Sequence, residues 1–227
     1  MITERIKEKW NADEVRILSI VTLIATFLMG ALDAYTFLTK NEAFVSAQTG
    51  NIVELGIKFV SADYKGMAIH LVSFIGYFTG AFIGEFMIDK VISRPKKRYA
   101  IFLGIQSILF LILILLYKIL PNAVIIFVFG GIAGYGIALF KQMGVITINN
   151  GAMTGNTKNL AAALYRSVIY RDQGNLKKFR SLILTILCFV CGVGVGAVLV
   201  SLMGNQLIWV FFGLSLLQYA VVCLFWK

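Results

Sequence analysis

Residues 47–56 read AQTGNIVELG, and residues 152–161 read AMTGNTKNLA. Both segments carry Thr-Gly-Asn with a similar order of small, polar and apolar residues around it, in a chain that is otherwise strongly apolar. A polar pattern that recurs so far along one chain indicates an internal duplication. Polar residues inside hydrocarbon are costly, so their presence there predicts a functional site. The same residues could instead cap two short helices, and this structural interpretation stays open.

The composition is that of a polytopic membrane protein. Hydrophobic residues make up 59% of the 227 residues and charged residues 14%, and the mean hydropathy is +0.85. A soluble domain does not have these values, and the length predicts one membrane domain over residues 1–227. The net charge is +10. The cations cluster between apolar segments, which indicates membrane topology and contact with anionic lipid rather than nucleic acid.

Six segments are long and apolar enough to cross a bilayer as helices, which takes about 20 residues. They run approximately from Val15 to Leu38, Gly66 to Ile88, Tyr99 to Leu120, Asn122 to Gln142, Phe179 to Leu202, and Gln206 to Trp226. The two Thr-Gly-Asn segments, at about 44–60 and 149–166, are shorter and more polar. Each is either a further span or a half-helix that enters and leaves on one side.

The distribution of Lys and Arg decides between these alternatives. Basic clusters occur within residues 5–16, 90–98 and 166–180. If both Thr-Gly-Asn segments are re-entrant, all three clusters fall on one side of the membrane. If both segments span, the cluster at 90–98 faces away from the N-terminus. The positive-inside rule therefore predicts six transmembrane helices plus two re-entrant half-helices, with both the N- and C-termini in the cytoplasm.

This topology makes the two halves an inverted repeat. Each half contains three spans, so repeat 2 (about 121–227) begins on the opposite side of the membrane from repeat 1 (about 15–120). Residues 51–60 would form about 15 Å of helix, or half the hydrocarbon thickness. The predicted fold is therefore an all-α polytopic membrane protein with a 3+3 inverted repeat, in which both half-helices begin near the midplane.

The Thr-Gly-Asn segments are predicted to form the substrate site. Asn is a preferred N-cap, and Asn51-x-x-Glu54 has capping-box spacing, of which the second copy is a weaker version. Two helix N-termini facing each other at mid-membrane would offer partial positive charge and spare backbone donors. Such a site suits a small anion, a carboxylate or a neutral polar solute. The residues expected to contact the substrate are Thr49, Gly50, Asn51, Thr154, Gly155 and Asn156.

Asp33, near the end of the first span, is expected to contact the substrate or to couple transport to protons. The alternative is an interfacial acid that caps the following turn, and both interpretations stay open. Glu54 precedes Lys58 by four residues, which is the spacing of an ion pair on one helix face.

Glycines at four-residue spacing recur in corresponding spans, as Gly80-x-x-x-Gly84 and Gly192-x-x-x-Gly196. Small residues at this spacing let helices approach closely. They predict tight packing, either between the repeats or between protomers. The small size of the chain and its many glycines are compatible with a homo-oligomer.

The chain carries no zinc-protease motif, no serine elbow and no Cys/His pair, so an enzymatic function is not expected. His70 is the single histidine. Cys188-x-x-Cys191 lies in an apolar span, where Cys usually packs as a small hydrophobe. No metal and no cofactor are therefore expected.

Residues 30–35, GALDAY, followed by residues 44–51, FVSAQTGN, resemble the signature of the YoaK-like family of bacterial inner-membrane proteins of unknown function. The resemblance covers nearly the whole chain. It is less faithful in the second half, where residues 136–139 read GIAL and a Gly-Leu-Gln-Asn run is expected, so no polar role is carried over to Ala138 or Leu139. The resemblance implies an integral protein of the bacterial plasma (inner) membrane and no particular substrate.

The leading functional hypothesis is a small-solute membrane transporter or channel whose partners are the lipid bilayer and a small-molecule or ion substrate. The alternative is a non-transporting membrane assembly, sensor or lipid-interacting protein. The two differ in one structural respect, because the alternative predicts no continuous polar path to the midplane.

Overall fold

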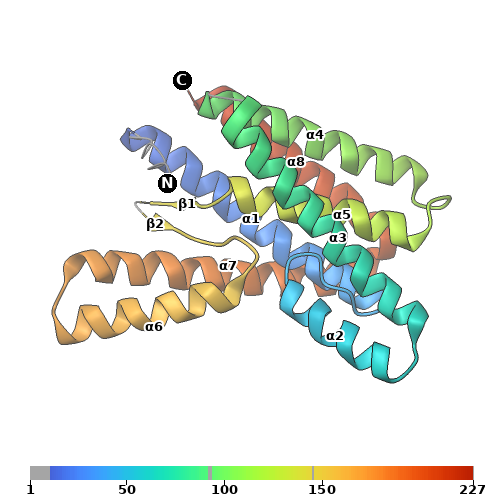
Figure 1. Cartoon of the computed structure of the whole chain (residues 1–227). Coiled ribbons are helices and arrows are strands. Elements are labelled where there is room, and N and C mark those ends of the chain that lie inside the picture. Colours follow the sequence, from blue (N-terminus) through green and yellow to red (C-terminus); the bar gives the residue numbers. More distant parts are fainter. Residues whose placement is uncertain (1–10, 92–93, 145, 227) are drawn as a thin grey trace.

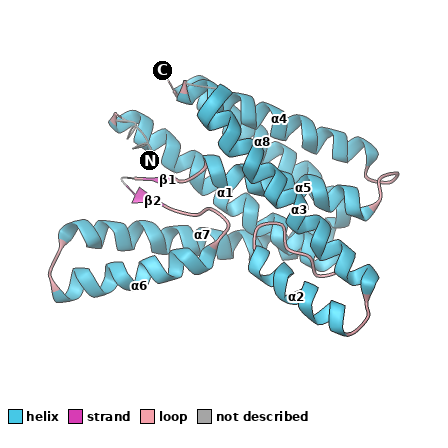
Figure 2. Ribbon diagram, in the orientation of Figure 1, coloured by secondary structure: helices cyan, strands magenta, loops and turns pink. Residues whose placement is uncertain are grey.

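The computed structural model describes residues 11–91, 94–144 and 146–226, and these are almost entirely helical (Figures 1 and 2). The α-helices are α1 (Ala12–Thr39), α2 (Gln48–Val60), α3 (Tyr64–Phe86), α4 (Pro95–Leu116), α5 (Asn122–Leu139), α6 (Met153–Ile169), α7 (Gln173–Met203) and α8 (Leu207–Phe225). A π-helical turn, η1 (Met87–Val91), extends α3, and a 3-10 turn, η2 (Gly204–Gln206), joins α7 to α8.

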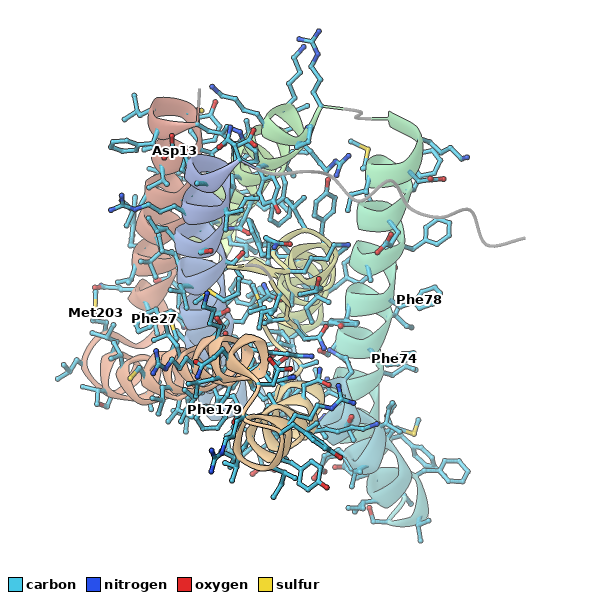
Figure 3. All side chains as sticks on the ribbon, turned by 90° about the vertical axis from the view of Figure 1, so that its left-hand side faces the viewer. Asp13, Phe27, Phe74, Phe78, Phe179 and Met203 are labelled. Carbon is cyan, nitrogen blue, oxygen red and sulfur yellow. The ribbon has the colours of Figure 1, made fainter. Side chains whose placement is uncertain are left out.

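Several helices are long and apolar enough to cross a membrane, which is compatible with a multi-pass membrane protein. Five such stretches occur among the described residues: Ala12–Thr39, Tyr64–Lys90, Pro95–Leu116, Asn122–Leu139 and Gln173–Phe225. The last one contains both α7 and α8. Large apolar side chains cover the periphery, as Figure 3 shows for Phe74 and Phe78, which project outward from α3. Such a surface suits a lipid environment.

The two Thr-Gly-Asn segments form the short helices α2 and α6. Figure 1 shows that both begin near the centre of the molecule and run in opposite directions, α2 beside α3 and α6 beside α7. The start of α1 and the end of α8 lie at one end of the molecule, on the side toward which α6 runs. The loop between α2 and α3 lies at the other end.

Glycines allow two close helix pairs, α3 with α5 and α7 with α1. A Cβ on Gly80 would lie 2.7 Å from the carbonyl carbon of Gly131, and one on Gly192 would lie 2.9 Å from that of Phe27. Real Cβ atoms essentially never come so near to backbone. The glycine spacing therefore provides packing between helices of one chain, which is one of the two alternatives left open by the sequence.

The interior is filled mainly by aromatic and aliphatic side chains. Tyr35 packs edge-on against Phe129 and Phe211, with ring centroids 5.7 and 5.8 Å apart. All three side chains are fully buried. Such edge-to-face contacts add about 0.5–1.5 kcal/mol per pair beyond burial. This cluster packs α1, α5 and α8 against one another.

Several expected span boundaries are wrong by three residues or more. The fourth predicted span ends at Leu139 instead of Gln142, because residues 142–143 (β1) pair with residues 146–147 (β2) in a short antiparallel hairpin. The fifth begins at Gln173 instead of Phe179, because Asp172 accepts hydrogen bonds from the N–H groups of Gly174 and Asn175 and so caps α7 earlier. The third runs from Pro95 to Leu116 instead of from Tyr99 to Leu120, and the first begins at Ala12 instead of Val15.

Candidate functional site

The loops that precede α2 and α6 meet inside the molecule. The Ser46 hydroxyl, which donates to Asp33 Oδ2, also lies 3.4 Å from the carbonyl oxygen of Gly151. Ser46 and Gly151 are both buried. A Cβ on Gly151 would lie 2.7 Å from the Ser46 Cβ, so only glycine allows this approach. The loops before the two short helices are thereby in contact.

Asp33 of α1 holds the first loop. Its Oδ1 accepts the backbone N–H groups of Val45 and Ser46, each at 2.8 Å, and its Oδ2 accepts the Ser46 hydroxyl at 2.5 Å. Asp33 is only 4% exposed. Hydrogen bonds to a carboxylate are about twice as strong as neutral ones, so this carboxylate determines the path of the loop. Asp33 thus bonds to backbone donors before α2 rather than capping the turn that follows α1.

Asn51 and Asn156 bracket their own loops in the same way. Asn51 Oδ1 accepts the N–H of Phe44 at 3.1 Å, and its Nδ2 donates to the Phe44 carbonyl at 2.6 Å. Asn156 does the same to Asn149, at 3.0 and 2.5 Å. In both cases the partner lies seven residues earlier, and both asparagines are fully buried.

These bonds correct the prediction that the asparagines are N-caps. Helix α2 begins at Gln48 after Ala47, and α6 begins at Met153 after Ala152, in both cases without a side-chain capping bond. The asparagines therefore lie within the first turns and turn back toward the loop. The physical reason is that backbone polar groups at a buried depth need partners, and the Asn amide supplies one donor and one acceptor at once.

Two residues of α3 extend the polar network around Asn51. Ser73 donates to the Phe44 carbonyl at 2.5 Å and lies 3.2 Å from Asn51 Nδ2. His70 Nδ1 lies 3.1 Å from Asn51 Oδ1. Because that amide oxygen is an acceptor, His70 Nδ1 must carry the hydrogen. The Nε2 atom of His70 is buried and has no partner among the described residues. Sequence analysis missed Ser73 in this role.

The other Thr-Gly-Asn residues line the first turns of the two helices. A Cβ on Gly50 would lie 2.9 Å from the ring of Phe44, so a side chain there would displace the loop. Gly155 lies beside the Asn149 side chain, whose Nδ2 is 3.2 Å from a Cβ position. Thr49 and Thr154 are exposed. The structure thus gathers the predicted residues into two related turns, with the asparagines buried and the threonines at the surface.

A groove of about 280 Å³ lies next to Asp33, between α1, α7 and the first loop. Its other lining residues are apolar, among them Phe37, Phe44, Phe189 and Val193. Both Asp33 oxygens already accept hydrogen bonds from the loop. The groove therefore offers an apolar surface rather than a polar binding site.

Asn150 is the most unusual residue in this region. It is fully buried, and neither its Oδ1 nor its Nδ2 has a partner among the described residues. Its Nδ2 lies 3.7 Å from a Cβ position on Gly136 of α5. A buried amide without partners is costly, so such a group in a folded protein needs an explanation. The polar run Asn149-Asn150-Gly151 before the second motif is the one sequence signal that points to this residue.

The described residues contain no group of three His, Cys, Asp or Glu side chains placed to hold a metal ion. The polar groups that converge here are amides, hydroxyls and one carboxylate. This arrangement can bind a polar solute by hydrogen bonds.

Comparison with known proteins agrees with the resemblance seen in the sequence. The family model described as "Protein of unknown function (DUF1275)" matches residues 21–221. No curated protein and no solved structure matches the chain. The matched range contains both Thr-Gly-Asn motifs, Asp33 and Asn150. The chain therefore belongs to the DUF1275 family, whose function is unknown, and the resemblance to its YoaK-like members is confirmed.

Proposed function

We propose that this protein is a small-solute transporter or channel of the bacterial plasma membrane, with its substrate site where the loops before α2 and α6 meet. The observation that carries this proposal is the contact of two buried loops, Ser46 with Gly151, at the origin of two oppositely directed short helices. Binding sites at the meeting point of broken helices from two repeats recur in membrane transporters.

An inverted repeat accounts for these helices. A Cβ on Gly30 would lie 3.0 Å from the Val193 nitrogen, and one on Gly134 would lie 2.8 Å from the Ala81 nitrogen. The same relation therefore links α1 to α7 and α5 to α3. Gly134 follows Gly30 by 104 residues, and Val193 follows Ala81 by 112 residues. These shifts support two repeats, at about 15–120 and 121–227.

In this proposal, α1, α3, α4, α5, α7 and α8 cross the membrane, and α2 and α6 are re-entrant half-helices. The basic residues Arg94, Lys96, Lys97 and Arg98 lie at the N-cap and in the first turn of α4, at the end of the molecule where α1 begins and α8 ends. The positive-inside rule then places this end in the cytoplasm.

The residues of the site have different roles in the proposal. Asn51, Asn156 and Asp33 position the loops, because their side chains are engaged with loop backbone. Gly50 and Gly155 allow the close turns. The exposed first-turn hydroxyls of Thr49 and Thr154 are the groups left to contact a solute on its path. The proposal involves no catalysis, metal or cofactor.

The experiment is solute flux into proteoliposomes that contain the purified full-length protein, screened with small carboxylates, inorganic anions and neutral polar solutes. An Asn51→Ala, Asn156→Ala double variant frees both loops and is expected to lose flux. Asn159→Ala changes an exposed asparagine on the same helix α6 and serves as the matched control. A double variant that stays monodisperse and keeps full flux would contradict the site assignment.

A second candidate is a non-transporting assembly, sensor or lipid-interacting protein. One observation favours it: the polar side chains of Asp33, Asn51 and Asn156 are hydrogen-bonded within the protein, and the groove beside Asp33 is apolar. This candidate predicts that water does not reach the loops. Labelling of a Ser46→Cys variant by a membrane-impermeant thiol reagent separates the two, because only a polar path admits the reagent.

A further inference from the structure

The first of the two loops is closed by a carboxylate that belongs to the protein. Two consecutive backbone N–H groups, of Val45 and Ser46, converge on one oxygen of Asp33 at 2.8 Å each. The loop before α2 therefore binds a carboxylate through two consecutive backbone N–H groups. A loop of the same shape elsewhere in the chain is expected to bind a carboxylate in the same way.

The second loop has the same geometry without that carboxylate. The repeat shift of 104 in the first helices relates Asp33 to Ile137, and the shift of 105 between Asn51 and Asn156 relates Val45 to Asn150 and Ser46 to Gly151. The structure agrees with this pairing, because Ile137 Cδ1 lies 3.4 Å from a Cβ position on Gly151. An aliphatic side chain thus stands beside the second loop where a carboxylate holds the first.

The donors of the second loop are left without partners. Among the described residues, the backbone N–H groups of Asn150 and Gly151 make no hydrogen bond, whereas their counterparts both bind Asp33. The Asn150 side chain is also buried with Nδ2 and Oδ1 unpartnered. Three donors at the start of the 17-residue helix α6 therefore lack an acceptor. The partial positive charge of a helix N-terminus makes a negatively charged acceptor the most favourable one.

We propose that the second loop binds the carboxylate group of a small organic acid, on the backbone N–H groups of Asn150 and Gly151 and the side-chain Nδ2 of Asn150. This inference rests on the proposed transport function and names the substrate class of the same site. Ile137 borders the site and contacts the alkyl part of the acid. A neutral solute would satisfy the donors with weaker bonds, because bonds to a charged acceptor are about twice as strong.

The test uses the full-length protein in nanodiscs at pH 7, with the thermal unfolding midpoint as readout and sodium acetate and sodium propionate as probes. Sodium chloride at equal concentration and buffer without added salt are the references. Both carboxylates are expected to raise the midpoint as their concentration increases, since a ligand that binds the folded state stabilises it. Equal stabilisation by chloride would overturn the assignment to carboxylates.

Two variants locate the effect. Ile137→Asp supplies an internal carboxylate in the position equivalent to Asp33, so it is expected to raise the midpoint and to abolish the response to acetate. Asn150→Leu removes one donor while keeping the branched shape of the side chain, and acetate should then bind at least about tenfold more weakly, as expected for a lost bond to a charged group. Asn159→Leu on the exposed side of α6 should respond like the wild type.

The outcomes separate this inference from the proposed function. If Asn150→Leu keeps the wild-type response to acetate, the carboxylate site is refuted, even where Ile137→Asp does not fold. Flux of a neutral solute without any acetate binding would refute the carboxylate site and leave transport standing. Acetate binding that Ile137→Asp abolishes and Asn150→Leu weakens, without flux of any solute, would support the site and refute transport.

Discussion

Replacement of Asp33 by Ala removes the acceptor for two buried backbone N–H groups and one hydroxyl. The Ser46 hydroxyl can still donate to the Gly151 carbonyl, which lies 3.4 Å away. The N–H groups of Val45 and Ser46 then remain unpaired, at about 1–3 kcal/mol each. We therefore expect Asp33→Ala to lower the free energy of unfolding by about 2–6 kcal/mol, which is large for a single substitution.

Asp33→Asn provides the comparison that identifies the mechanism. Its amide oxygen can accept both backbone N–H groups, and its amide nitrogen can donate to Ser46 Oγ while that hydroxyl turns to Gly151. We expect a loss within about 1 kcal/mol, because removal of a buried charge offsets part of the weaker bonding. Asp89→Ala, at a side chain that is 71% exposed, should change stability by less than about 0.5 kcal/mol.

The assay is reversible unfolding in mixed micelles by increasing denaturing detergent, combined with hydrogen exchange at the Val45 and Ser46 amides. Asp33→Ala should speed exchange at these two amides well before global unfolding. Equal stability of the Ala and Asn variants, with unchanged exchange at both amides, would refute the view that an acceptor at position 33 holds the loop.

Two further predictions concern helix packing and pH. Gly80→Ala places a Cβ 2.7 Å from the Gly131 carbonyl carbon and should lower the free energy of unfolding by about 1–3 kcal/mol in the same assay. A Cβ on Gly194 meets nothing within 4 Å, so Gly194→Ala should not destabilise the protein. Equal effects of the two substitutions would contradict the close packing of α3 on α5. Desolvation by burial lowers the pKa of Lys40 from 10.5, so the unfolded chain binds more protons and the free energy of unfolding should rise as the pH increases through the lowered pKa toward 10.5. Lys40→Met should flatten this rise, and a rise of the same size in both proteins would exclude Lys40 as its source.

Apolar periodicity and glycine spacing were sufficient to predict the helical membrane fold and its close packing. Both depend on short-range rules, since about 20 apolar residues make a span and small residues allow close approach. The glycines at 80 and 192 meet backbone of another helix, as their spacing suggests. The sequence predicts these features because the same local residue types, apolar runs and small residues, directly allow the membrane span and the close helix contact.

The role of Asn51 could not be read in this way. Its spacing to Glu54 favours an N-cap, yet the helix begins three residues earlier and the amide pairs with Phe44 instead. The preference of Asn for caps is weaker than the need of a buried loop to pair its backbone groups. Which carbonyl lies within reach depends on how the loop folds against α1 and α3, and the sequence does not specify that.

The two repeats carry the same residue where two helices touch through their backbones, and different residues where a side chain bonds to the loop. At Gly30 and Gly134 any Cβ would lie within about 3 Å of another helix's main chain, so both repeats need glycine there. The equivalent positions 33 and 137 carry Asp in one repeat and Ile in the other. A duplicated scaffold can therefore keep its shape while only one of its loops carries its own anion. In such a molecule the loop without the carboxylate is the one with donors left to bind a solute.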